Sequence, residues 1–248
     1  MQMYAASHAK HKAFYVRNTQ SLQSVNLSHT PLLAAIRFSF VPSLYIIMMT
    51  SLSPSCEVKM KTTHLYFVRH AQPDESHLDD RSRPLTPLGL ADRSGVTMTL
   101  KGRGITRCVS SPYKRAVDTI APFCSEEDIL ITTDERLRER QMGPKASDFL
   151  EKRWADYSVA EEGGETINEV RERLIPALND ILDNNEGESV VIGFHGAALS
   201  IIMNYLDSSC GLDWFRMIHD MLPYIIRFDF EGREYLGSEE LFRIERGY

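Results

Sequence analysis

The sequence predicts an α/β fold of three layers, α/β/α, in which helices cover both faces of a mostly parallel central sheet. Two runs of large apolar residues, 65–68 and 190–194, have the composition of strands that are buried on both faces of a parallel sheet. A third strand-like run covers 105–109. Segments with helical signals alternate with these runs along the chain, which is the order expected of this architecture.

Capping residues and periodicity predict the elements between and after these strands. Thr86 with Pro87, and Ser111 with Pro112, each combine an N-cap with a proline at the first helical position. Thr166–Glu169 is a capping box before an amphipathic stretch. In order, we expect a loop over 73–83, helices over 86–100 and from 112, a short strand at 129–132, a charged connector at 135–143, helices over 146–157 and 166–182, a helix from 197 and a strand at 224–230.

The carboxyl ends of three predicted strands carry arginine or histidine. Arg69 and His70 follow the first strand, and His195 follows the strand at 190–194. Arg115 falls in the first turn of the helix after the third strand. Because ligands of parallel sheets bind just beyond these strand ends, the three sites are expected to meet. Fixed cations beside an imidazole nucleophile indicate chemistry on an anion and favour a phosphate.

Five motifs in the order of one family occur between about Met60 and the C-terminus. They are Arg69-His70-Ala71, Leu85-Thr86-Pro87-Leu88-Gly89, Ser111-Pro112-Tyr113-Lys114-Arg115-Ala116, Gly163-Gly164-Glu165-Thr166 and His195-Gly196. With these motifs the chain resembles the histidine phosphatase superfamily, the phosphoglycerate mutase-like enzymes. The resemblance implies the three-layer fold and phosphoryl transfer through a phosphohistidine.

The resemblance also implies a role for each residue at the strand ends. His70 is expected to attack phosphorus, because neutral imidazole is a nucleophile near neutral pH. Arg69 and Arg115 are expected to bind the phosphoryl oxygens, since a guanidinium can donate to two oxygens at once. His195 is expected to bind the same group and to take part in catalysis.

Glu139 resembles the family's general acid, which stands in a Leu-x-Glu segment with a glycine a few residues later. Glu135 is the rival for this role, and the charged run that holds both is alternatively a solvated surface. A carboxyl group that acts as an acid near neutral pH needs burial or a nearby phosphate charge to keep its proton.

Two positions depart from the family pattern. Ala71 stands where the family has glycine, and its methyl group is expected to narrow the phosphate pocket. Ser76 stands where many relatives have asparagine. We predict Ser76 and Gln72 as secondary phosphate contacts. Neither departure removes a reactive group, so an active enzyme is expected.

A phosphatase is favoured over a mutase. The segment between Arg115 and His195 lacks the insertions that build the closed pocket of glycolytic mutases, and residues 145–163 lack a basic cluster. We therefore expect a phosphomonoester hydrolase that acts on a small phosphorylated substrate without a cofactor. We expect it to be metal-independent, because the chain has no HExxH motif and no other obvious metal-ligand spacing. Mutase-type phosphoryl transfer is one alternative, and a catalytically weak phosphate-binding module is another.

Charge and cysteine usage narrow the partners and the location. The chain has a net charge of −6, and basic residues outnumber the one acidic residue before Met60, so the rest of the chain is more acidic still. This charge argues against a nucleic-acid partner. The 4 cysteines form no CxxC pair, which indicates reduced core residues and a cytoplasmic protein.

Residues 1–59 are expected to be an N-terminal extension, and 60–248 a single histidine phosphatase domain. The extension has no clear period, and we expect it to be disordered or to follow from a start assigned too far upstream. Its apolar stretch over 31–49 contains Arg37 and Pro42 and is short of the roughly 20 apolar residues of a spanning helix, so no membrane partner is predicted. A signal sequence or anchor is the alternative. Oligomeric state is left open.

Overall fold

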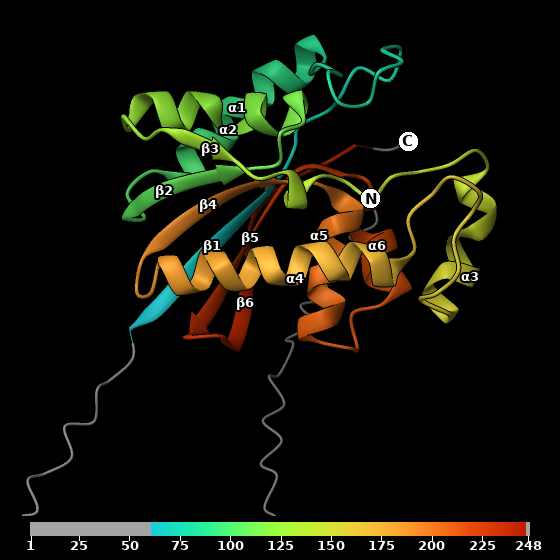
Figure 1. Ribbon diagram of the computed structural model, residues 1–248. Coiled ribbons are helices and arrows are strands. Elements are labelled where there is room, and N and C mark those ends of the chain that lie inside the picture. Colours follow the sequence, from blue (N-terminus) through green and yellow to red (C-terminus); the bar gives the residue numbers. More distant parts are fainter. Residues whose placement is uncertain (1–60, 247–248) are drawn as a thin grey trace, which may run out of the picture. The chain divides into compact units, whose positions relative to one another are not determined.

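The computed structural model describes residues 61–246, whose strands form a six-stranded sheet in the order β3-β2-β4-β1-β5-β6. The predicted extension over 1–59 lies outside the described residues. The strands are β1 (Thr62–Arg69), β2 (Ile105–Ser110), β3 (Ile131–Thr133), β4 (Ser189–Phe194), β5 (Met221–Glu231) and β6 (Glu234–Glu245). Figure 1 shows α1 and α2 on one face of this sheet and α4 and α5 on the other, which is the predicted three-layer arrangement.

The α-helices follow the predicted order with one addition, α6. The α-helices are α1 (Pro87–Leu100), α2 (Lys114–Glu126), α3 (Leu150–Ala155), α4 (Ile167–Asn184), α5 (Gly196–Leu206) and α6 (Leu212–His219), and two short 3₁₀ helices are η1 (Glu135–Leu137) and η2 (Ala146–Phe149). Helix α6 and strand β6 were not predicted from the sequence. Thr166 and Glu169 form the predicted capping box at the start of α4.

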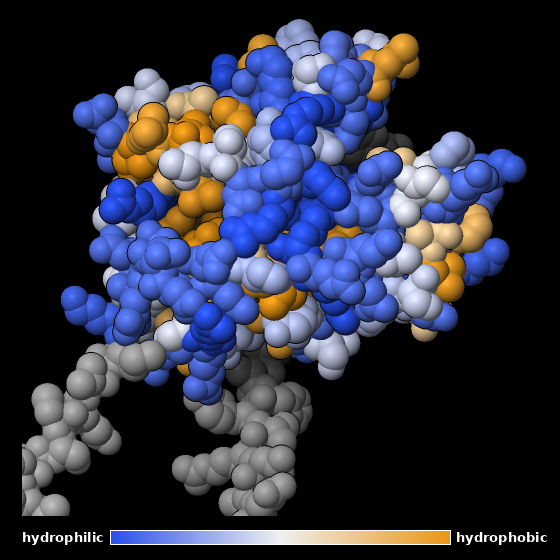
Figure 2. All heavy atoms as spheres, in the orientation of Figure 1, coloured by the Kyte–Doolittle hydropathy of each residue, from blue (hydrophilic) through white to orange (hydrophobic). Residues whose placement is uncertain are grey.

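Strand β1 is buried on both faces, as its composition predicts. Leu65 and Phe67 are fully buried in a core shared with α4 and α5. Tyr66 and Val68 alternate with them and face a second core, shared with α1 and α2. Because successive side chains of a strand point to opposite faces, one apolar run supplies both cores. The outer face of α4 is largely hydrophilic (Figure 2).

The sheet is mixed, whereas the sequence analysis predicted a mostly parallel one. The neighbours β3, β2, β4 and β1 run parallel, but β5 is antiparallel to β1 and β6 is antiparallel to β5. A two-residue loop joins β5 to β6, and its Gly232 has a positive φ of 56°. A loop this short can join only antiparallel strands, so it fixes the direction of β6. Most residues of β6 are polar and outside the core, which is why its sequence lacks a strand pattern.

Two further expectations needed correction. Helix α2 begins at Lys114 and not at Pro112; the hydroxyl of Ser111 accepts a hydrogen bond from the backbone N–H of Tyr113, 3.3 Å away. The expected helix over 146–157 is instead η2 followed by α3. In the part of the chain that the structure describes, no helix is long and apolar enough to cross a membrane.

The parallel register brings three strand ends to one edge of the sheet. In β4, Gly193 is the partner of Val68 in β1 and of Ser110 in β2. Beyond the strands, the backbone N–H of His70 donates to the carbonyl of Phe194 at 3.1 Å, and that of Ser111 donates to the carbonyl of Gly193 at 2.9 Å. The residues that follow β1, β2 and β4 are therefore neighbours.

Candidate active site

A cavity of about 380 Å³ opens at the carboxyl ends of β1, β2 and β4. Its wall combines basic, acidic and apolar side chains from several segments. The lining residues are Arg69, His70, Pro73, Glu75, Asp80, Arg83, Arg115, Glu139, Arg140, Met142, Gly196, Ala197, Phe215, Ile218, His219 and Leu222. Four of the seven predicted site residues, Arg69, His70, Arg115 and Glu139, are among them.

The ring of His70 is held in one tautomer. Its Nδ1 lies 2.8 Å from the carbonyl oxygen of Ala71, and only a protonated nitrogen can bond to a carbonyl. The other nitrogen, Nε2, accepts a hydrogen bond from Nε of Arg115 at 3.2 Å. Both contacts fit a neutral imidazole with its lone pair on Nε2, the form that a nucleophile requires.

Burial keeps both site histidines neutral. Burial, and after it the charges of Arg115 and Arg69, hold the pKa of His70 well below its usual value. Burial, and after it the charges of Arg115, His70 and Arg69, hold the pKa of His195 well below its usual value. Desolvation and nearby cations both disfavour an imidazolium, so they act in the same direction.

Arg69 is fixed by backbone carbonyls. Its Nη1 donates to the carbonyl oxygens of Ile218, of His219 at 2.9 Å and of Met221 at 3.1 Å. Its guanidinium also lies against the first residue of α5, because a Cβ at Gly196 would be only 2.9 Å from Arg69 Nε. Gly196 is therefore required for the approach of Arg69 to α5.

Arg115 is almost fully buried and contacts both His70 and the loop over 73–85. Besides His70, it contacts the carbonyl oxygen of Asp80 at 2.6 Å and the Asp80 carboxylate at 3.2 Å, both through Nη1. Its guanidinium lies over the ring of Tyr113, 4.9 Å from the centroid. The sequence analysis missed Asp80, since it stands in a polar loop without a distinguishing motif.

His195 lies behind His70 rather than in the cavity wall. The two ring centroids are 5.3 Å apart, and His195 is fully buried. Its Nε2 is 2.7 Å from the hydroxyl of Ser111, whereas its Nδ1 is buried without a hydrogen-bond partner in the described structure. A buried ring nitrogen of this kind is normally satisfied by a partner such as a ligand or water.

The carboxylate of Glu139 lies at the N-terminus of α5. Its two oxygens accept hydrogen bonds from the backbone N–H groups of Ala197 at 3.1 Å and Ala198 at 2.9 Å. A third comes from the N–H of Arg140 at 2.8 Å. Helix N-termini attract negative charge, so these donors fix the position of the carboxylate at the cavity wall.

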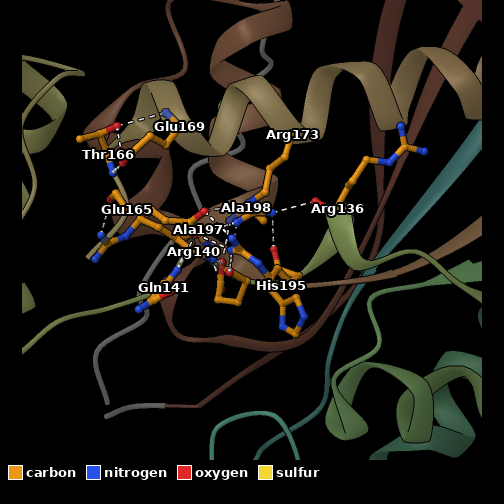
Figure 3. Close-up of polar contacts among 12 residues, drawn as sticks. Arg136, Arg140, Gln141, Glu165, Thr166, Glu169, Arg173, His195, Ala197 and Ala198 are labelled. Atoms are coloured by element: carbon orange, nitrogen blue, oxygen red, sulfur yellow. Dashed lines mark hydrogen bonds and ion pairs between the residues drawn. The ribbon is translucent and has the colours of Figure 1, made fainter. Parts of the chain in front are cut away.

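A half-buried ion-pair network supports the segment that carries Glu139 (Figure 3). Arg173 of α4 donates to the carbonyl oxygens of Arg136, Arg138 and Glu139 at 2.7, 2.8 and 3.1 Å. Glu165 accepts bonds from both Arg138 and Arg173. Burial alone would raise the pKa of Glu165, but these hydrogen bonds lower it to about 2.

The structure gives the other candidates different positions. Gln72 accepts a hydrogen bond from the Thr86 hydroxyl at 3.1 Å, and the Ser76 hydroxyl donates to Asp74 at 2.6 Å. Neither lines the cavity. The rival acid Glu135 is exposed and paired with Arg81 at 2.7 Å, outside the cavity.

Ala71 does not narrow the cavity, contrary to expectation. The residue is fully buried and does not line the cavity wall. Its φ is not positive, and its backbone N–H donates to the hydroxyl of Thr119 at 3.0 Å. Alanine is therefore accommodated where the family has glycine.

Within residues 61–246, no group of three or more His, Cys, Asp or Glu side chains is placed to hold a metal ion.

Comparisons with solved structures show the fold. The Bacillus stearothermophilus protein YhfR matches with a TM-score of 0.60 and 26% identity, over 70% of this chain and 94% of that protein. A mycobacterial glucosyl-3-phosphoglycerate phosphatase matches with a TM-score of 0.59 and 19% identity, over 75% of this chain and 100% of that chain. The phosphoglycerate mutase of Bacillus anthracis str. Sterne matches with a TM-score of 0.58 and 16% identity, over 73% and 93%.

Sequence comparisons show the family. A probable phosphoglycerate mutase of Cronobacter sakazakii is 32% identical over 164 residues, which are 56% of this chain and 73% of that protein. Residues 65–235 match the histidine phosphatase superfamily, branch 1. These residues include all five motifs and the cavity, and the chain therefore belongs to the histidine phosphatase superfamily.

Proposed function

We propose that the protein is a phosphomonoester hydrolase that works through a phosphohistidine at His70, without a metal ion. The observation that supports this most strongly is the arrangement around His70. Its Nε2 carries the lone pair, Arg115 lies 3.2 Å from that atom, and both side chains line a cavity that also holds Glu139. A nucleophile, an anion-binding group and a proton donor are the parts that covalent phosphoryl transfer needs.

The proposed reaction has two steps. Nε2 of His70 forms a bond to phosphorus while the bond from phosphorus to the alcohol oxygen breaks, and Glu139 gives a proton to that oxygen. Water then attacks phosphorus, the bond to Nε2 breaks, and Glu139 takes the proton from the water. Arg69 and Arg115 stabilise the charge on the transferring oxygens. A role for His195 in binding one of these oxygens stays a prediction: its Nδ1 has no hydrogen-bond partner in the described residues, but its ring lies behind His70 and does not line the cavity.

A phosphatase agrees with the short segment between Arg115 and His195. Phosphoglycerate mutase-type transfer is the second candidate, because several relatives carry that description. A weak binding module is less favoured, because the proposed nucleophile His70, the two arginines Arg69 and Arg115, and the proposed acid Glu139 all line one cavity. We also propose a cytoplasmic location, supported by the free thiols of Cys108, Cys124 and Cys210.

Hydrolysis of a panel of phosphomonoesters in EDTA tests the function. We expect phosphate release that vanadate inhibits, and a loss of at least about 10³-fold in kcat for His70→Ala, because the covalent step disappears. His64→Ala is the matched control: His64 pairs with Asp229 at the opposite end of β1 and should keep full activity. Activity that EDTA abolishes, or that survives in His70→Ala, would contradict the proposal.

Replacement of Glu139 by glutamine tests the proton donor. For alkyl esters, whose leaving groups need a proton, we expect Glu139→Gln to lower kcat by about 10²–10⁴-fold, but by less than about tenfold for 4-nitrophenyl phosphate. Steady-state rates on both substrates measure the difference. Glu135→Gln, at the exposed residue paired with Arg81, should change neither rate by more than about twofold. Equal losses on the two substrates would remove Glu139 from the acid role.

The neutral state of His70 predicts a pH dependence of stability. Below about pH 6.5 the unfolded chain protonates this histidine and the folded protein does not, so acid favours unfolding. The free energy of unfolding should therefore fall between about pH 7 and pH 5, with His70 contributing up to about 1.4 kcal/mol per pH unit. Urea unfolding should show a shallower slope for His70→Asn, and an unchanged slope for the exposed control His77→Asn. Identical slopes for wild type and His70→Asn would show that the folded protein protonates His70 as readily as the unfolded chain.

A further inference from the structure

The cavity wall away from His70 is largely apolar. Met142 and Phe215 line it together with Ile218 and Leu222. Phe215 and Ile218 come from α6, and Leu222 comes from the start of β5. A leaving group that extends from a phosphoryl group at His70 would therefore meet carbon atoms over much of its surface. Apolar groups bind favourably to such a wall because both surfaces leave water.

A smaller apolar hollow of about 40 Å³ continues this wall. Its apolar lining shares Met142, Ala197 and Phe215 with the main cavity and adds Trp154, Ile167 and Ile201. Its two charged lining residues are Arg140, which the main cavity shares, and Arg153. The apolar surface thus extends from the cavity between α3, α5 and α6. Figure 2 shows apolar side chains at the surface near α3, at the right of the view. This continuity gives a chain or ring on the substrate a place to bind.

The other basic side chains that line the cavity are paired with carboxylates of the protein, so they do not need a second anionic group on the substrate. Beyond Arg69, His70 and Arg115, the basic lining residues are Arg83, Arg140 and His219. The ring of His219 lies 2.9 Å from the carboxylate of Asp220. Arg83 pairs with Glu75 at 3.4 Å and with Asp80 at 3.1 Å, and both of those carboxylates also line the cavity.

The remaining lining arginine, Arg140, is paired with a buried carboxylate that does not itself line the cavity. Arg140 bonds to the buried carboxylate of Glu161 at 2.7 Å, a carboxylate that it shares with Arg153. A second anionic group on a substrate would have to break one of these pairs or lie beside the carboxylates of Glu75 and Asp80. Either arrangement costs free energy that a neutral group avoids.

We infer that the substrate is the phosphomonoester of a neutral, largely apolar alcohol, alkyl or aryl, with no second anionic group. This inference rests on the proposed function, because it places the phosphoryl group at His70. It distinguishes the protein from an enzyme of phosphoglycerates, whose carboxylate would meet an apolar wall and paired arginines. The apolar wall selects the leaving group, and the buried arginines select the phosphate.

Binding of two phosphonates to the full chain tests the inference without requiring turnover. Hexylphosphonate and 5-carboxypentylphosphonate have the same length and differ in a terminal methyl or carboxylate. By calorimetry we expect hexylphosphonate to bind at least about tenfold more tightly, and affinity to rise by about two- to fourfold per methylene from butyl to hexyl. The kcat/KM values of the matching alkyl phosphates should follow the same order.

A charge introduced on the wall should change the preference. Met142→Lys places a cation beside the apolar surface, and we expect it to reduce the preference for hexylphosphonate by about tenfold. Met98→Lys is the matched control, since Met98 is exposed on α1 and does not line the cavity. It should leave the preference unchanged.

The outcomes separate the inference from the proposed function. Equal or tighter binding of 5-carboxypentylphosphonate to the wild type overturns the inference, whether or not esters are hydrolysed. Hydrolysis of the alkyl phosphates with no gain from chain length overturns the inference alone and leaves the phosphatase intact. Absence of both phosphonate binding and hydrolysis overturns the two together.

Discussion

The parallel pairing of β4 with β1 on one side and β2 on the other is the constraint on which the site depends. Gly193 of β4 is in register with Val68 and Ser110, so the chain leaves all three strands at the same level. The groups that follow, from Arg69 to His195, are far apart in sequence but meet at one sheet edge. Cores on both faces hold this register, because a shift by one residue would exchange their buried side chains.

The arginine charges and the burial at this sheet edge have two different effects. Burial beside Arg69 and Arg115 keeps His70 neutral, which preserves its lone pair. The same arginines place positive charge in the cavity wall. The N-terminus of α5 and the Glu165 network hold the carboxylate of Glu139 in place. The fold thus places a neutral imidazole and a carboxyl group in the wall of one cavity.

Sequence patterns predicted the parts of the molecule that depend on local chemistry. The buried strands, the Thr166 capping box and the strand-end arginines and histidines were all predicted, and Arg115 does lie in the first turn of α2. The missed parts depend on tertiary contacts. Polar β6 is a strand because it pairs with β5, and Asp80 matters because the loop over 73–85 folds back to Arg115. Ala71 does not narrow the cavity as expected, because the residue is fully buried and does not line the cavity wall.

Locating the phosphoryl group in the covalent intermediate tests the central claim most directly. Rapid quench of the enzyme with substrate, followed by ³¹P NMR and peptide mass spectrometry, identifies the modified atom. The hydrogen bond from Nδ1 of His70 to the Ala71 carbonyl leaves only Nε2 for attack, so the account predicts phosphorus on Nε2 of His70. Phosphorus on Nδ1, on another residue, or on no residue while turnover proceeds would contradict it.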